Sequence, residues 1–313
     1  MKNISIFYPQ DEFTSEQLQK LEFAGKVSFT DNIKNCSLKE IIRISKNADI
    51  VAVNPIVGED SSRQLLEILK KSSNIKGLAL NSTNINYIDK QYCKERNIAV
   101  TVVPNCATTQ AVAEQTLLIL LGSAKRIFIN GYKAQKRNFQ QELGNELFGK
   151  TLGIIGINAV SEEIVKLAKP FGLRIFVWND IPMRLETAHR KSLEEVLTKS
   201  DFITINLPET ETNKKFISKE KISIIKKNAV LINLSSRTLI DETAMFEALK
   251  NRYVDQYIYE TNRLTSSPLQ NTEYAIAFKP ISKHTQESKN RSQELWVNNI
   301  VALSRNTPIN LVN

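Results

Sequence analysis

Short apolar runs alternate with amphipathic stretches along most of this chain, and that alternation restricts the possible folds. In the first third, the apolar runs are ISIFYP, ADIVAV, IKGLAL and IAVTVV. Between them, the segments SEQLQKLEF, LKEIIRIS and RQLLEILKK repeat apolar residues at steps of three and four, as an amphipathic helix does. Strands that alternate with helices predict a parallel sheet covered by helices, which is the α/β class.

A second series of the same kind begins at Thr151. Its apolar runs are TLGIIG, IFVW, FITINL, AVLINL and YVDQYIY, with helical stretches between them. The pattern SLEE at Ser192–Glu195 is a capping box, and DETAMFEALKN begins at Asp241 with acidic residues in its first turn. The second series therefore predicts a second α/β unit.

The length of 313 residues also favours two domains, because single hydrophobic cores stop growing at about 250–300 residues. The segment from Thr108 to about Lys136 contains AVAEQTLLILLGSAKR, which is apolar on too many faces for a surface helix. We expect it to form a long buried helix that joins or packs the two domains. The end of the chain, from His284, predicts one amphipathic helix and a polar tail.

The composition argues against several classes of protein. The net charge is +9, but the lysines are scattered and form no basic block, so nucleic-acid binding is not expected. No apolar stretch reaches the roughly 18 residues of a membrane span, and MKNISIFYPQ lacks the apolar core of a signal peptide. Cys36, Cys93 and Cys106 have no paired spacing, which predicts reduced thiols and no metal site. We expect a cytoplasmic protein without a nucleic-acid or membrane partner.

The segment from Thr151 to Asp180 carries the motif with the most chemical content. A strand, a turn at Gly156, a helix and a second strand that ends in an acid about twenty residues on form a dinucleotide-binding βαβ unit. Only the first glycine of G-x-G-x-x-G is present, because Asn158 and Ser161 occupy the second and third places. A side chain at Asn158 stands where a pyrophosphate normally approaches the backbone of the helix N-terminus.

The phrases around this motif extend the pattern over nearly the whole chain. ELFGKTLGIIG, AKPFGLRIFVWND, SDFITINLPETETNKKFI, AVLINLSSRTLIDETAMFEAL and VDQYIYE follow one another in the order and spacing of the D-isomer-specific 2-hydroxyacid dehydrogenases. VAEQTLLILLGSAKR resembles the inter-domain helix of that family, and the chain most resembles its phosphoglycerate dehydrogenase-like members.

The resemblance implies two Rossmann-like domains with parallel sheets, one flavodoxin-like and one dinucleotide-binding. The NAD-binding domain would span residues 102–283, and the substrate domain would combine residues 1–101 with residues 284–313. The family also implies NAD as cofactor, a small 2-hydroxy or 2-oxo acid as substrate in the cleft between the domains, and a homodimer.

This chain has the family's residue at some of the catalytic positions and a different residue at one of them. The resemblance places the arginine that holds the substrate carboxylate at Arg237, and its acidic partner at Glu260. A plain surface-loop arginine remains the alternative for Arg237. The family's proton-donating histidine falls on Pro280, which has no proton to give. Lys279 adjoins that position and is the predicted substitute, with Lys283 and His284 close behind.

The resemblance also assigns residues to the cofactor. The predicted contacts are Gly156, Asn158, Ala159, Val160, Asn179, Asp180, Pro208 and Asp255. The acid that binds the ribose in the family aligns with Asn179, which leaves Asp180 one residue late; an ordinary loop aspartate is the alternative. Asp255 is assigned to the carboxamide of the nicotinamide. A further departure is the loop Asn81–Asn84, which replaces a glycine-containing carboxylate loop of the family.

Two functions stay open at this point. The first is a divergent NAD(H)-linked oxidoreductase of a small 2-hydroxy or 2-oxo acid, because Arg237 and Glu260 are retained. The second is a pseudoenzyme, a binding or regulatory protein on the same scaffold, because the replaced residues are concentrated at the site while the framework phrases are intact.

Overall fold

The chain forms two compact units. The computed structural model describes residues 1–54, 65, 67–82, 88–181, 188–262 and 267–313. One unit combines Met1–Thr108 with Gln286–Asn313, and the other is Thr109–Thr285. The first border falls after Thr108 rather than at Thr101, because the last helix of the chain holds this segment: Asn299 Nδ2 donates to the carbonyl of Val102 over 2.8 Å.

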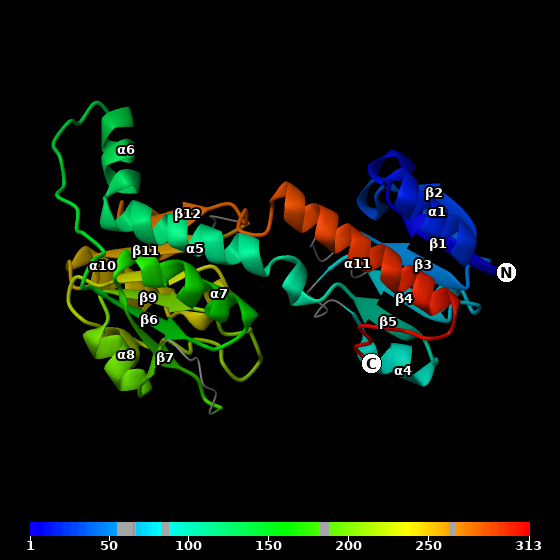
Figure 1. The fold of residues 1–313 in the computed structure, drawn as a ribbon. Coiled ribbons are helices and arrows are strands. Elements are labelled where there is room, and N and C mark those ends of the chain that lie inside the picture. Colours follow the sequence, from blue (N-terminus) through cyan, green and yellow to red (C-terminus); the bar gives the residue numbers. More distant parts are fainter. Residues whose placement is uncertain (55–64, 66, 83–87, 182–187, 263–266) are drawn as a thin grey trace. The chain divides into compact units, whose positions relative to one another are not determined.

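The first unit is built on a five-stranded parallel sheet (Figure 1). Its strands are β1 (Lys2–Phe7), β2 (Gly25–Thr30), β3 (Ile50–Val53), β4 (Gly77–Leu80) and β5 (Ala99–Val102). The order β2-β1-β3-β4-β5 is that of a flavodoxin-like sheet. β2 is a strand that the sequence analysis missed, because GKVSFT is half polar and shows no continuous apolar run.

Helices cover both faces of this sheet. They are α1 (Ser15–Ala24), α2 (Leu38–Ser45), α4 (Lys90–Glu95) and α11 (Gln286–Ser304). Trp296, Val297 and Ile300 of α11 are fully buried against the apolar side chains of β1 and β3. The predicted helix RQLLEILKK lies partly outside the described residues, since only 65 and 67–71 are described, and those are helical. The tail is not free: Leu311 pairs antiparallel with Thr101.

The second unit is built on a seven-stranded parallel sheet. Its strands are β6 (Thr151–Ile155), β7 (Arg174–Trp178), β8 (His189–Arg190), β9 (Phe202–Ile205), β10 (Val230–Asn233), β11 (Gln256–Glu260) and β12 (Ala275–Phe278). The order β12-β11-β10-β9-β6-β7-β8 is the doubly wound dinucleotide-binding order, extended by one strand. The predicted α/β class with two Rossmann-like parallel sheets is therefore confirmed.

Two groups of helices cover this sheet. On one face lie α5 (Thr109–Ala124) and α7 (Ala159–Ala168), and on the other lie α8 (Leu193–Lys199), α9 (Lys219–Ser223) and α10 (Glu242–Lys250). The capping box at Ser192 and the cap at Asp241 are both present as predicted. No helix in the described ranges is long and apolar enough to cross a membrane.

The predicted long helix from Thr108 to Lys136 is wrong in one respect. It is two helices, α5 and α6 (Ile127–Gln135), and Arg126 between them has a left-handed backbone with φ of 58°. An arginine is not a residue that predicts such a break, which is why the sequence pattern ran through it. Nη1 of Arg126 forms an ion pair of 2.8 Å with Asp255, and this contact accompanies the break.

Candidate functional site

The candidate site lies at the carboxyl ends of the strands of the second sheet. β6 and β9 are neighbours in this sheet. The strands that follow β6 in the sequence are added on one side of this pair, and the strands that follow β9 are added on the other side. Such a reversal of strand order opens a crevice at the carboxyl ends, where ligands of this architecture bind. Gly156 follows β6 and Asn206 follows β9, so these two residues border the crevice.

Gly156 makes the turn that leaves β6. Its φ is +93°, and a Cβ placed there would lie 3.0 Å from the carbonyl carbon and oxygen of Asn206. Both the left-handed backbone and the close approach exclude an ordinary side chain. The one glycine of the fingerprint that the chain keeps is therefore the one that its backbone requires.

Asn158 caps the helix that follows this turn. Its side-chain oxygen accepts from the backbone N–H of Val160 over 3.0 Å and of Ser161 over 3.1 Å. Its side-chain nitrogen donates to the carbonyl of Asn206 over 2.7 Å. Ala159 is exposed beside the cap. The amide of Asn158 thus joins the β6–α7 turn to the end of β9, across the crevice.

Two candidate ribose-binding residues lie at the end of β7. The side-chain oxygen of Asn179 accepts from the N–H of Ile157 over 3.1 Å, so this residue supports the turn. Asp180 is exposed, and its carboxylate accepts from the N–H of Ile181 over 2.9 Å. Pro208 is exposed after β9, on the other side of the crevice from Asp180 in the strand order.

Arg237 lies just beyond β10 and is held firmly. Its Nε and Nη2 donate to the two carboxylate oxygens of Glu242 over 2.6 and 2.8 Å, and its Nη1 donates to Oγ1 of Thr261 over 2.9 Å. The guanidinium also lies 5.5 Å from the ring centroid of Tyr259. The hydrogen bonds to Glu242 raise the pKa of Arg237, so the group stays cationic. A quarter of its side chain is exposed.

Glu260 ends β11 and binds a turn beyond β12. One carboxylate oxygen accepts from the N–H groups of Ile281 and Ser282 over 3.0 and 2.7 Å. The other accepts from the hydroxyl of Ser282 over 2.8 Å. Thr261, the residue after Glu260, contacts Arg237. Glu260 and the guanidinium therefore lie at the same edge of the sheet.

Lys279 does not join Glu260. The register of β11 on β12 pairs Glu260 with Phe278, and successive residues of a strand point to opposite faces. The next residue, Lys279, therefore begins on the other face from Glu260. It is exposed, and among the described residues its ammonium has no hydrogen-bond or ion-pair partner.

Lys283 is the lysine that responds electrostatically to Glu260. It lies in the turn closed by the hydrogen bond from the N–H of His284 to the carbonyl of Ile281, the turn that Glu260 holds. Lys283 is exposed like Lys279, but the surrounding protein partly desolvates its ammonium and lowers its pKa, and the negative charge of Glu260 opposes that shift. His284 is exposed in the same turn.

Asp255 lies at the wrong end of its strand for the predicted role. β11 runs from Gln256 to Glu260, so Asp255 precedes its amino end, about 16 Å of strand away from Glu260. There it pairs with Arg126 over 2.8 Å and is buried. The assignment of Asp255 to a nicotinamide carboxamide is corrected by this geometry, which makes it a structural partner of the α5–α6 break.

The remaining predictions concern the first unit and metals. Of the loop Asn81–Asn84, only Asn81 and Ser82 lie within the described residues, and the carbonyl of Ser82 accepts from the N–H of Val103 over 3.1 Å. In the described part of the chain, no cluster of histidine, cysteine or acidic side chains could hold a metal ion.

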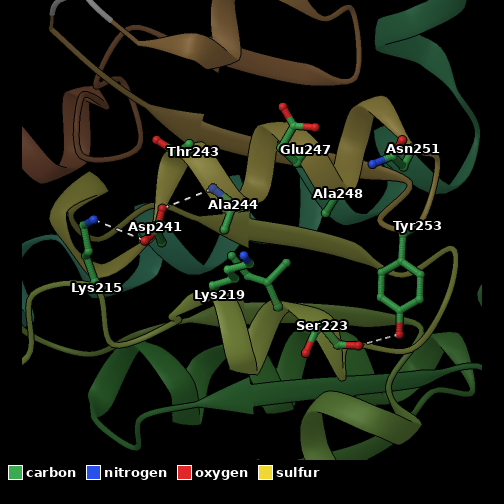
Figure 2. A pocket seen from close by; sticks show the side chains of 11 residues that line it. Lys215, Lys219, Ser223, Asp241, Thr243, Ala244, Glu247, Ala248, Asn251 and Tyr253 are labelled. Atoms are coloured by element: carbon green, nitrogen blue, oxygen red, sulfur yellow. Dashed lines mark hydrogen bonds and ion pairs between the residues drawn. The ribbon is translucent and has the colours of Figure 1, made fainter.

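A cavity of about 610 Å³ opens between α9 and α10, away from these groups (Figure 2). Lys215 and Asp241 form an ion pair of 3.2 Å in its wall, and the hydroxyl of Tyr253 donates to the carbonyl of Ser223 over 2.9 Å. Its lining contains none of the predicted site residues. The polar groups that converge at the carboxyl edge, rather than this cavity, make the candidate site.

Sequence reasoning missed three residues of the site. Asn206 contributes a backbone carbonyl, which no side-chain pattern reveals. Glu242 looked like an ordinary first-turn acid of α10, although it also orients Arg237. Ser282 follows Pro280 by two residues, and its bonds to Glu260 could be found only from the path of the chain after β12.

Comparison with known proteins gives a consistent result. The family model described as "D-isomer specific 2-hydroxyacid dehydrogenase, NAD binding domain" matches residues 117–276, just over half of the chain. The chain is 28% identical over 247 residues to the D-3-phosphoglycerate dehydrogenase of Methanocaldococcus jannaschii; the match covers 77% of this chain and 45% of that protein, so this chain spans less than half of that relative's length. It is 27% identical over 293 residues to the glyoxylate reductase of Pyrococcus horikoshii, with 88% and 87% covered.

Solved structures agree on the fold. A glyoxylate reductase from Paecilomyes thermophila superimposes with a TM-score of 0.81 at 20% identity, covering 99% of this chain and 98% of that one. At this level of identity, the likeness establishes the two-domain architecture alone.

Proposed function

The chain belongs to the D-isomer specific 2-hydroxyacid dehydrogenase family, and on that premise we propose that it is an NAD(H)-linked oxidoreductase of small 2-oxo or 2-hydroxy acids. The observation that carries the proposal is the retention of Arg237 and Glu260 at one edge of the sheet, joined through the contact of Arg237 with Thr261. Relatives named glyoxylate reductase and D-3-phosphoglycerate dehydrogenase support this class of substrate.

The crevice between β6 and β9 fits a dinucleotide, with one obstruction. The strand order, the left-handed turn at Gly156 and the N-terminus of the ten-residue helix α7 are the parts that such a ligand needs. The obstruction is the cap made by Asn158, and losing an asparagine cap costs about 0.5–2 kcal/mol. Binding would therefore be weakened but not abolished. The turn from Gly156 to Val160 would hold the diphosphate, Asp180 would bind a ribose hydroxyl, which favours NAD, and Pro208 would border the opposite side.

Arg237 would bind the substrate carboxylate. Its guanidinium is planar and always charged, and it matches a carboxylate through paired hydrogen bonds. Glu242 fixes its orientation through two of its nitrogens, so little side-chain freedom is lost when an acid binds. A carboxylate held here places the neighbouring 2-oxo carbon at the same edge as Glu260.

The reduction of a 2-oxo acid needs a hydride and a proton. The nicotinamide would supply the hydride when bound, and the chain must supply the proton. Pro280 has none to give, and Lys279 starts on the other face from Glu260. We therefore assign the proton to the Nζ of Lys283, because Glu260 holds its turn by three hydrogen bonds. A lysine with a lowered pKa is also a better acid at neutral pH than an ordinary one.

A pseudoenzyme is the second candidate function. It is favoured by the replacement of a proton-donating histidine by Pro280, and by the engagement of both carboxylate oxygens of Glu260 with the turn at Ile281 and Ser282. In that case, the chain would keep the scaffold and bind a small acid or a partner without turnover.

One assay separates the two functions. We expect the purified chain to quench or enhance NADH fluorescence in a titration, and to oxidise NADH with glyoxylate, hydroxypyruvate, pyruvate or phosphohydroxypyruvate as acceptor. Turnover should depend on Lys283, because a positioned acid is worth about 10²–10⁴-fold and the histidine of the family is replaced. An acceptor-free reaction is the control. Absence of both binding and turnover would contradict the oxidoreductase and leave the pseudoenzyme.

We also propose that the chain forms a homodimer through α5, α6 and the segment after them. Large apolar side chains are exposed there: Leu118, Ile127, Tyr132, Phe139 and Leu143. Large exposed apolar patches mark protein interfaces, and these side chains come from one stretch of the sequence. Sedimentation should show a dimer, and I127K should dissociate it, whereas F23K, at an exposed apolar site of α1, should leave it intact. A monomer at every concentration would refute the proposal.

A further inference from the structure

The side chain of Asn158 binds the backbone N–H groups that would bind the diphosphate of a dinucleotide. We infer that Asn158 is the residue that sets how tightly this chain holds its cofactor, because its side-chain amide acts as an internal substitute for the diphosphate. The inference rests on the proposed dinucleotide site and goes beyond it, since it names the group with which a dinucleotide must compete.

The contacts of Asn158 support this interpretation. Its backbone is extended, with φ of −157°, and its side-chain oxygen accepts from the N–H groups of Val160 and Ser161. These belong to the first turn of α7, where free N–H groups and the positive end of the helix dipole bind anions. One oxygen of a phosphate would need the same two donors. The side-chain oxygen and the phosphate oxygen cannot occupy this position together.

The other end of the amide is bonded as well. Its nitrogen donates to the carbonyl of Asn206, which follows β9 and lies next to Gly156. A side chain at position 158 without this nitrogen would cap the helix but leave this bond unmade. The chain therefore holds Asn158 in place by bonds at both of its ends.

A second asparagine completes the substitution. Asn179 stands where the family has an acid, and its side-chain oxygen accepts from the N–H of Ile157 in the same turn. Side-chain oxygens of two asparagines thus bind three N–H groups, those of Ile157, Val160 and Ser161. In this chain, the β6–α7 turn is stabilised by neutral groups of its own and does not require an anion.

The magnitude follows from what must be displaced. A dinucleotide has to break the cap and the bond to Asn206, which are each worth roughly a factor of ten or less in an equilibrium constant. We therefore expect removal of the side chain to strengthen dinucleotide binding by about 10- to 100-fold. Glycine is the suitable replacement, because it is nearly as good a helix cap as asparagine and fits an extended backbone.

The test is a fluorescence or calorimetric titration of NADH against the full chain and its variants. N158G should bind NADH about 10- to 100-fold more tightly than the unmodified chain. N158S keeps a shorter cap but loses the bond to Asn206, and should fall between them. N158D keeps an oxygen on the helix but adds a negative charge, so it should bind more weakly than the unmodified chain.

S192G is the matched control. Ser192 caps α8 in the same unit, away from the crevice, with a bond of 3.1 Å to the N–H of Glu195. Because glycine is nearly as good a cap, S192G should change the melting temperature little and leave the affinity for NADH unchanged. The dissociation constant of inorganic pyrophosphate, measured by competition with NADH, should also be lower for N158G than for the unmodified chain.

The outcomes distinguish this inference from the proposed function. If the unmodified chain binds NADH and N158G binds it equally or less tightly, the inference is overturned while the proposed function stands. If only N158G binds, the inference holds, and the unmodified chain is not an NAD-linked enzyme. If neither the unmodified chain nor N158G nor N158S binds NADH or pyrophosphate, although all melt cooperatively, both ideas fail.

Discussion

Replacing Lys283 by methionine is expected to lower the rate of 2-oxo acid reduction by about 10²–10⁴-fold, with little change in the KM for the acid. Methionine keeps the length and the apolar stem of the side chain but has no proton to give. The expected loss is that of a positioned acid, and Arg237 still binds the carboxylate. Steady-state kinetics of K283M measure both parameters.

K279M is the matched control for this variant. It removes the same charge four residues away, from a lysine that is exposed and has no polar partner among the described residues. Its kinetics should be unchanged within a factor of about two, since its side chain starts on the other face of the sheet from Glu260 and exposed charges contribute little. Equal losses in K279M and K283M would refute the assignment of the proton to Lys283, and a loss in K279M alone would return it to Lys279.

The pH dependence of the reduction rate distinguishes a Lys283 that donates the proton from a Lys283 with a purely structural role. Reduction needs the protonated lysine, and withdrawal from water lowers the pKa of Lys283 below its usual value near 10.5. The rate should therefore fall as the pH rises through that lowered pKa. In K283M, this alkaline limb should disappear, while the slow residual reaction keeps its rate across the same range.

The fold was predictable because its signals are local and repeated. In the second unit, runs such as TLGIIG and AVLINL are buried on both faces, so their apolar character survives in the sequence. β2 was missed because its residues are only partly buried. The break at Arg126 was missed because an arginine does not signal a left-handed backbone, and its ion-pair partner Asp255 is distant in sequence. Elements were therefore predictable where burial alone decides them.

The candidate site was predictable only in part, for a related reason. Gly156 could be identified because a left-handed turn leaves a glycine in the sequence. The sequence showed that Asn158 was out of place, but not that its amide reaches the carbonyl of Asn206. The choice between Lys279 and Lys283 depends on strand register and on the turn that Glu260 holds. Pairwise geometry of this kind is set by the whole fold, and no local pattern encodes it.

Replacing Arg237 is expected to have the other large effect, because its guanidinium has two roles. It would bind the substrate carboxylate, and it pairs with Glu242. R237M should lower kcat/KM for a 2-oxo acid by about 10- to 10²-fold, since a hydrogen bond to a charged group is worth about 1.5–3 kcal/mol and the carboxylate would lose its cationic partner. It should also destabilise the chain, because Glu242 would lose its partner while largely buried. R237K keeps the charge but not the planar pair of donors, so it should recover stability more than activity.

The double variant R237M/E242Q separates the role of Arg237 in substrate binding from its role in stability. It removes both charges together, so no carboxylate is left buried without a partner, and its melting temperature should return towards that of the unmodified chain. Its kcat/KM should stay as low as that of R237M, because the substrate carboxylate still has no guanidinium to bind. If activity returned together with stability, Arg237 would be a structural residue, and the ion pair with Glu242 would be its whole function.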